Sequence, residues 1–211
     1  MRISCKMFAT FAVLGLWSGA GYSIRAQTHP AAAELIQKLQ SDKTTDEARK
    51  EVLQLTASDP NIRRYLAVDL PVMIQAGPES CPQSDIVDLD AKWHSCPWYN
   101  AVELAGQLRI DEAAPALTRW INWRTTSMVV SPSSEAKLTF YPAARALYKI
   151  GDPSIPALQG VLNSGSTGEH GRAVRVLCII RTPKAKAVLQ DDLQRELDPD
   201  LQQMIKNTLR E

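Results

Sequence analysis

The chain has 211 residues, of which 45% are hydrophobic and 22% charged, and this is enough for a domain with its own core. Its 24 lysines and arginines nearly balance its 23 aspartates and glutamates. This balance gives no electrostatic reason to expect a nucleic-acid partner, so we predict none.

The first 26 residues have the order of a secretory signal peptide. Arg2 and Lys6 precede an apolar run over 7–21, and small residues with a polar exit follow. The run is shorter than the roughly 20 residues that span a bilayer. We expect residues 1–26 to be removed on export to the periplasm or the exterior, which leaves no transmembrane segment. Cleavage after Ala20 and an uncleaved anchor are the alternatives.

Apolar residues recur at helical spacing along almost the whole mature chain, 27–211, and no stretch keeps the alternation of a strand for long. The pattern predicts an all-α domain with amino-terminal helices over 31–40, 44–57 and 60–75 and a last helix over 199–210. We expect the third helix to end or kink at Leu70-Pro71.

Four dipeptides place a side-chain acceptor directly before a proline and a helical run: Asp59-Pro60, Asp152-Pro153, Thr182-Pro183 and Asp198-Pro199. Asp or Thr at such a position accepts a hydrogen bond from the first turn of the helix. Proline loses nothing there, because that N–H group has no partner inside the helix. Each dipeptide therefore predicts the start of a helix.

Three segments share one helix, turn and helix pattern: VELAGQLRIDEAAPALTRWI (102–121), ARALYKIGDPSIPALQGVL (144–162) and VRVLCIIRTPKAKAVLQDDL (174–193). The first helix ends in an apolar residue, which is Leu108, Ile150 or Ile180. A short turn with Asp or Thr follows, and the second helix opens with proline or a small residue. One such pair cannot cover its own apolar face, so neighbouring pairs must stack.

These segments resemble the HEAT-like helical repeats of phycobilisome-lyase-like proteins, most specifically in GDPSIPAL. The third segment departs from the pattern, because Lys186 stands where the others have proline. The resemblance covers about half of the mature chain. It implies a right-handed superhelix of stacked antiparallel helix pairs that serves as a binding scaffold, and it implies no particular reaction.

Two segments, 77–97 and 124–139, fall outside the repeat and are expected to form inserted loops. Cys81 and Cys96 bracket the first, and in an exported chain this favours a disulfide worth about 3 kcal/mol of stability. A metal site is disfavoured, because His94 and Cys96 are closer in sequence than structural zinc ligands usually are. We expect the third mature cysteine, Cys178, to be a core residue.

The four mature tryptophans fall within 93–123, and arginines flank two of them. Core packing is one interpretation, since large aromatic side chains are mostly buried. The other is a surface for a protein or peptide partner, because Trp and Arg are enriched at binding hot spots. The candidate contacts of such a surface are Trp93, His94, Trp98, Arg119, Trp123 and Arg124.

Residues that could carry catalysis are few. The mature histidines are His29, His94 and His170, and none lies in a recognisable arrangement with a nucleophile. His170 is expected in a turn or a first helical turn, and we expect the polar outer face of a terminal cap to hold Asp191, Asp192, Arg195 and Glu196. We therefore predict no catalytic residue, no metal and no cofactor. The function indicated is an exported, non-enzymatic scaffold for a protein or peptide; the alternative is a ligand-handling, lyase-like enzyme with a pocket near 81–96.

Overall fold

The computed structural model describes the following parts of the chain: 30–39, 45–80, 96–125, 138 and 140–211. The regular elements in these parts are all helices, which confirms the predicted all-α class. None of the described helices is both long and apolar enough to cross a bilayer. The predicted signal peptide and most of both predicted insertions lie outside the described residues.

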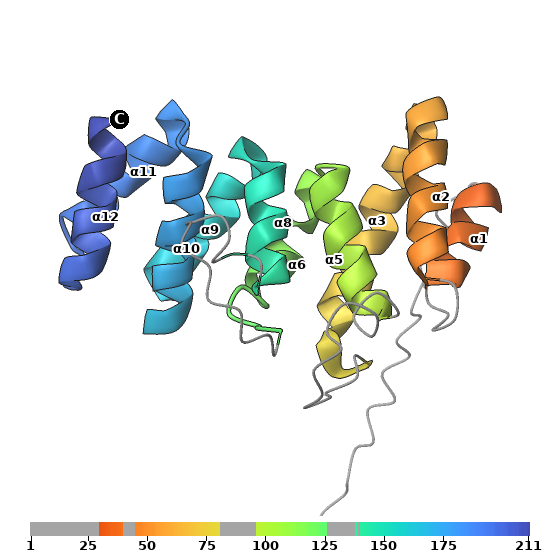
Figure 1. Ribbon diagram of the computed structural model, residues 1–211, viewed down its shortest axis with the longest axis horizontal. Coiled ribbons are helices and arrows are strands. Elements are labelled where there is room, and N and C mark those ends of the chain that lie inside the picture. Colours follow the sequence, from red (N-terminus) through yellow and green to blue (C-terminus); the bar gives the residue numbers. More distant parts are fainter. Residues whose placement is uncertain (1–29, 40–44, 81–95, 126–137, 139) are drawn as a thin grey trace, which may run out of the picture.

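The helices form two layers, and the chain alternates between the layers along a long axis (Figure 1). The front layer consists of α2 (Thr45–Ser58), α5 (Pro97–Gln107), α8 (Pro142–Ile150), α10 (Thr167–Ile180) and α12 (Pro199–Arg210). The back layer consists of α3 (Pro60–Ala76), α6 (Ala114–Thr118), α9 (Ile155–Ser164) and α11 (Pro183–Leu193). The first helix, α1 (Pro30–Leu39), packs against α2 and α3. Short 3₁₀ helices occupy connections: η1 (Pro78–Ser80), η2 (Asp111–Ala113) and η3 (Asp152–Ser154).

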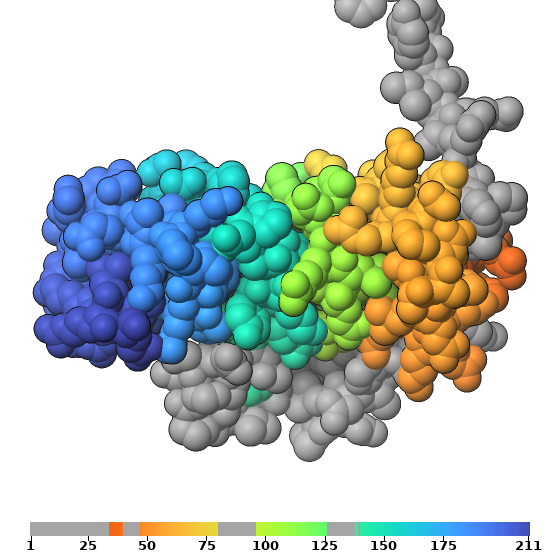
Figure 2. Space-filling model, turned by 90° about the horizontal axis from the view of Figure 1, so that it is seen from above, coloured from red at the N-terminus to blue at the C-terminus, as the bar shows by residue number. Residues whose placement is uncertain are grey.

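Each helix packs mainly against its neighbours in the same layer and against the next helix of the other layer. Figure 2 shows the consequence, because the colours follow one another along the long axis in sequence order. A stack of packed helix pairs of this kind is consistent with an α-solenoid, in which each pair buries the apolar face of the next.

The core runs between the two layers from one end of the stack to the other. Its fully buried side chains are mainly leucine and isoleucine, among them Leu35, Leu66, Leu104, Leu117, Leu147, Leu158, Leu177, Leu189 and Ile205. In the middle of the stack, α5 and α8 approach very closely. A Cβ atom added to Gly106 would lie 2.9 Å from the Cα atom of Ala146. The glycine therefore permits this contact, because any larger side chain would push the helices apart.

Three of the four predicted helix starts are confirmed. The side chains of Asp59, Thr182 and Asp198 accept hydrogen bonds from main-chain N–H groups in the first turns of α3, α11 and α12, at 2.9, 3.3 and 2.8 Å. The prediction for Asp152 is wrong, because this residue is itself the first residue of η3 and makes no side-chain cap. Its carboxylate instead accepts a hydrogen bond from the hydroxyl of Thr182, which joins two successive turns of the stack.

Pro71 does not end the third helix. α3 continues through Pro71 to Ala76, although proline removes one helical hydrogen bond. Leu70 and Ile74, on either side of the proline, are completely buried. The packing of these side chains therefore offsets the local cost of the proline.

The described ends of the two predicted insertions are ordered parts of the stack. α5 already begins at Pro97, with Cys96 as its capping residue. At the second insertion, the main-chain N–H of Thr125 donates to the carbonyl oxygen of Phe140 at 2.9 Å. The bounds 77–97 and 124–139 of the two insertions remain predictions, because most of both segments lies outside the described residues.

Candidate binding surface

A group of polar side chains joins α5 and α8 in the front layer. Glu103 on α5 is only 6% exposed. One of its carboxylate oxygens accepts a hydrogen bond from Arg145, and the other lies 3.2 Å from Nζ of Lys149. Arg145 also donates to the hydroxyl oxygen of Tyr99 at 3.0 Å. The net charge of these three side chains, Glu103, Arg145 and Lys149, is one positive charge.

The pKa values of Arg145 and Tyr99 are shifted so that each side chain keeps one charge state at neutral pH. Burial acts to lower the pKa of Arg145, but the Glu103 carboxylate and the Tyr99 hydroxyl more than offset this and raise the pKa above its ordinary value. Burial also raises the pKa of Tyr99. Arg145 therefore remains a cation and Tyr99 a neutral phenol at neutral pH.

Polar contacts also join α5 to α2. NH1 of Arg49 donates to Oδ1 of Asn100 on α5 at 3.0 Å. The amide of Asn100 in turn donates to the carbonyl oxygen of Cys96 at 3.0 Å. Polar contacts therefore link three consecutive helices of the front layer.

A second group of basic side chains lies near the amino-terminal end of α8. The guanidinium carbon of Arg172 on α10 is 3.3 Å from the centre of the Tyr141 ring, and that of Arg124 is 5.8 Å from the centre of the Phe140 ring. Burial lowers the pKa of Arg172 below its ordinary value, and the positive charges of Arg175 and Arg124 act in the same direction. An anion beside these arginines would reduce their mutual repulsion.

The predicted contact residue Trp98 belongs to the core. It is 1% exposed, and its Nε1 donates to the carbonyl oxygen of Ile74 at 3.1 Å. Its ring meets the rings of Trp123 and Trp120 edge to face, with centroid distances of 4.6 and 6.2 Å. This burial fits the core-packing interpretation of the tryptophans, and Trp98 has no surface to offer a partner.

Two of the other predicted contact residues, Arg119 and Arg124, are exposed. Arg119 is exposed and lines a groove between α6 and α9 in the back layer. Arg124 is exposed and lies beside Phe140. Trp93 and His94, on which the lyase-like alternative also depends, lie outside the described residues.

Arg145, Lys149, Arg172 and Arg175 are not among the residues predicted from the sequence. Their only sequence signal is spacing, since Arg145 and Lys149 are four residues apart and Arg172 and Arg175 three apart, and residues at these separations share a helix face. Such pairs are common on solvated helices, so the spacing alone could not distinguish a binding surface.

The family model of the PBS lyase HEAT-like repeat matches residues 143–164. These residues are α8 after its first residue, the turn with η3, and α9, and they pack within the two-layer stack. The chain therefore carries a HEAT-like repeat over these residues. No curated protein and no solved structure matches the chain. The matched repeat itself carries Arg145 and Lys149, so the first basic group belongs to the repeat and not to an insertion.

Proposed function

We propose that this HEAT-like repeat protein is an exported, non-enzymatic scaffold that binds an acidic segment of a partner protein across its front layer. The observation that carries the proposal is Arg172, which lies against the Tyr141 ring and is close enough to Arg124 and Arg175 to be affected by their positive charges. The charged and apolar order of residues 1–26 supports export. The repeat resemblance supports a right-handed superhelix, a form that offers extended binding surfaces.

Charge complementarity selects an acidic partner. The Arg172 pKa is lowered by burial and by neighbouring positive charge, so a carboxylate would relieve an unfavourable local field. Arginine binds carboxylates through two parallel hydrogen bonds, which gives geometry as well as energy. Tyr99 and Tyr141 add contact area at a small cost in conformational entropy.

Site-specific crosslinking in the native cell envelope tests this surface. A photo-crosslinking residue at position 175, in the front layer, should capture one defined partner. The same residue at position 184, which is exposed on α11 in the back layer, is the matched control. Equal capture from both positions, or capture from neither, would contradict a front-layer binding site.

A peptide titration tests the charge preference. A short fluorescein-labelled peptide rich in glutamate should bind the mature protein at low salt, and the same peptide with glutamine in place of glutamate should not. Arg172→Gln with Arg175→Gln should weaken binding by about tenfold, whereas Lys184→Gln with Lys186→Gln on α11 should leave it unchanged. Circular dichroism confirms that each double variant is folded.

The chain's own acidic segment is the competing occupant. Asp85, Asp88 and Asp90 belong to the first predicted insertion, which lies outside the described residues. If they filled the basic surface, Asp85→Asn, Asp88→Asn and Asp90→Asn together would expose it and increase peptide affinity. We expect the peptide affinity of this triple variant to equal that of the unaltered protein.

A further inference from the structure

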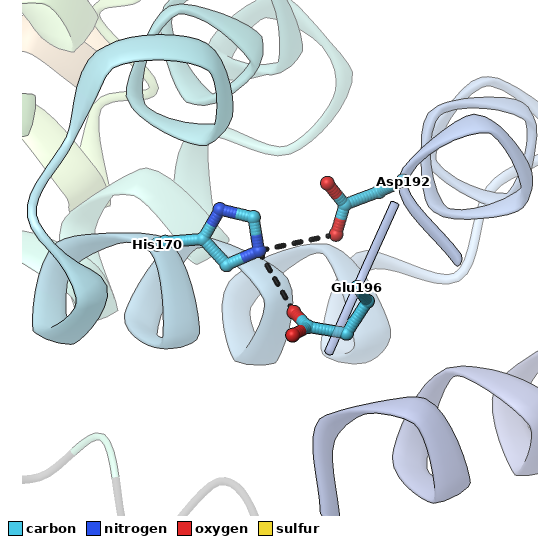
Figure 3. A group of neighbouring side chains, drawn as sticks. All are labelled: His170, Asp192 and Glu196. Atoms are coloured by element: carbon cyan, nitrogen blue, oxygen red, sulfur yellow. Dashed lines mark hydrogen bonds and ion pairs between the residues drawn. The ribbon is translucent and has the colours of Figure 1, made fainter. Parts of the chain in front are cut away.

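Three side chains that could ligate a metal converge where α10, α11 and α12 meet (Figure 3). Nε2 of His170 lies 2.9 Å from Oε2 of Glu196 and 3.3 Å from Oδ2 of Asp192. The three ligand atoms all lie within 4.8 Å of one another. The histidine side chain is 23% exposed, the aspartate 2% and the glutamate 7%, so the cluster is nearly enclosed but reachable from solvent.

Local structure fixes the position of each side chain. His170 lies in the first turn of α10, which a reciprocal capping box between Ser166 and Glu169 holds in place. Asp192 is the penultimate residue of α11, and Glu196 follows in the turn before α12. The main-chain N–H of Glu196 donates to the carbonyl oxygen of Asp192 at 2.9 Å, so both carboxylates face the same side.

The predicted outer position of this acidic segment is therefore wrong for Asp192. This residue is 1% exposed, whereas Asp191 and Arg195 are exposed as expected. The turn after α11 rotates Asp192 and Glu196 toward α10 instead of toward solvent. The histidine that they meet lies 26 residues before Glu196, a separation that gives no local sequence signal.

The hydrogen bonds of His170 indicate which kind of species must lie between the three side chains. Its Nδ1 lies 3.2 Å from the carbonyl oxygen of Leu162 and must donate to it, because a carbonyl can only accept. A neutral ring then has its lone pair on Nε2, facing two carboxylates. Three electron-rich atoms in this arrangement require a positive species among them, which is either a proton or a metal cation.

A proton would satisfy only part of the cluster. A hydrogen on Nε2 can bond to Glu196, but Oδ2 of Asp192, which is buried and lies 3.3 Å from Nε2, makes no hydrogen bond within the described part of the chain. A cation would contact all three atoms at once.

We propose that His170, Asp192 and Glu196 bind a divalent transition-metal ion, with Zn²⁺ as the best match. Zn²⁺ accepts imidazole nitrogen and carboxylate oxygen ligands at about 2.1 Å, which places neighbouring ligand atoms roughly 3.0 to 3.4 Å apart. The two shorter separations in the cluster are close to this range. Two carboxylates balance the charge of the ion, and a mixed nitrogen and oxygen set favours Zn²⁺ over Ca²⁺ or Mg²⁺.

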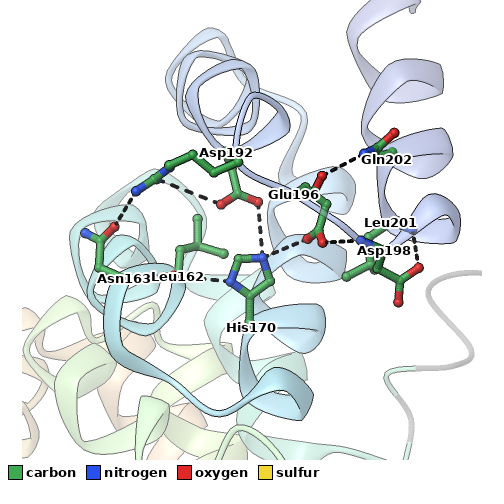
Figure 4. A network of polar contacts seen from close by, with 9 residues as sticks. Leu162, Asn163, His170, Asp192, Glu196, Asp198, Leu201 and Gln202 are labelled. Atoms are coloured by element: carbon green, nitrogen blue, oxygen red, sulfur yellow. Dashed lines mark hydrogen bonds and ion pairs between the residues drawn. The ribbon is translucent and has the colours of Figure 1, made fainter.

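Surrounding groups hold the ligands in place, as they do in established metal sites (Figure 4). The second oxygen of Glu196 accepts from the main-chain N–H of Asp198 at 2.7 Å, and its main-chain carbonyl accepts from Gln202 at 2.6 Å. Arg195 is 63% exposed, and its NH2 lies 4.0 Å from Oδ1 of Asp192, not from the inward Oδ2. A bound ion would therefore tie α10 to the turn between α11 and α12 and close the last unit of the stack.

The first test is a calorimetric titration of the mature, oxidised protein with Zn²⁺ at neutral pH, with native mass spectrometry for the stoichiometry. We expect one equivalent to bind. Asp192→Asn and Glu196→Gln should each weaken binding at least about tenfold. Asp191→Asn removes the same charge at the neighbouring exposed position and should leave the affinity unchanged. Equal affinities for all three variants, or no stoichiometric binding, would overturn the proposal.

The second test does not depend on any variant folding. In ¹⁵N-labelled unaltered protein saturated with Zn²⁺, Nε2 of His170 should carry no proton and its resonance should shift, while Nδ1 keeps its proton. A ring that stays protonated on both nitrogens with Zn²⁺ bound elsewhere would show that an imidazolium bridge, and no metal, completes the cluster. That result would also overturn the proposal, and it would leave the front-layer binding function untouched.

Discussion

Arg145 on α8 donates a hydrogen bond to the buried carboxylate of Glu103 on α5, in the helix pair where Gly106 lies directly against the main chain of Ala146. Because Glu103 is 6% exposed, its removal would leave Arg145 and Lys149 close together without a counter-charge. We expect Glu103→Gln to lower the free energy of unfolding by about 2 kcal/mol. This is less than the cost of breaking a fully buried ion pair, because both cations retain some contact with water.

Urea unfolding followed by circular dichroism measures this change. Glu112→Gln is the matched control, because Glu112 is an exposed acid in η2 of the back half of the same repeat unit. Its free energy of unfolding should change by less than about 0.5 kcal/mol. The role assigned to Glu103 fails if both variants lose the same stability.

Gly151 and Gly160 should respond in opposite directions to the same substitution. Gly151 has φ 79° and ψ −139°, a conformation that residues with a side chain rarely adopt. A Cβ atom at either glycine would meet no atom within 4 Å, so steric contacts play no part. We expect Gly151→Ala to destabilise by about 2 kcal/mol through the backbone alone. Gly160→Ala, inside α9, should stabilise by about 0.5 to 1 kcal/mol.

Thermal unfolding of the two variants gives the comparison directly. Gly151→Ala should lower the midpoint temperature, and Gly160→Ala should raise it by a smaller amount. A neutral Gly151→Ala variant would mean that the turn between α8 and α9 relaxes to an ordinary backbone conformation.

The turns between paired helices show what can be predicted from local sequence patterns. Leu108, Ile150 and Ile180 mark equivalent helix ends in the sequence, and each is followed by a residue with positive φ. At two of these turns that residue is an arginine, so the usual glycine signal is missing and only the repeat alignment identifies the turn. Helix starts and the stacked architecture are encoded by residues a few positions apart, and they can be predicted.

The candidate sites depend on distant contacts and could not be predicted in the same way. Glu103 is the only charged residue of α5, and its partner Arg145 is 42 residues away. Asp192 and His170 are likewise brought together only by the packing of α10 against α11. Burial of a charged residue is decided by which face of its helix meets a neighbour, and the composition of the segment does not reveal this.

Trp98 and Trp120 allow the indole hydrogen bond to be separated from packing. Nε1 of Trp98 donates to the carbonyl oxygen of Ile74, whereas Nε1 of Trp120 is buried and has no partner among the residues that the structure describes. Trp98→Phe should therefore cost more stability than Trp120→Phe, by about 1 kcal/mol, because that carbonyl keeps only the bond from Gly77. Chemical denaturation of both variants measures the difference, and equal losses would mean that the hydrogen bond contributes nothing beyond the packing of the ring.

Cysteine accessibility tests the predicted Cys81–Cys96 disulfide together with the burial of Cys178. Cys178 is a free thiol that is 6% exposed, and burial raises its pKa above the ordinary value. A raised pKa means less thiolate at any given pH, so iodoacetamide should label the native mature protein much more slowly than a free thiol at mildly alkaline pH.

Unfolding the mature protein without reductant should make one cysteine reactive, namely Cys178, because the other two are predicted to be joined. Adding reductant to the unfolded protein should make all three mature cysteines reactive, since Cys5 is lost with the predicted signal peptide. Intact mass after labelling counts the modified thiols. Three labels without reductant would exclude the disulfide, and rapid labelling of the native protein would show that the α10 and α12 contact around Cys178 opens readily.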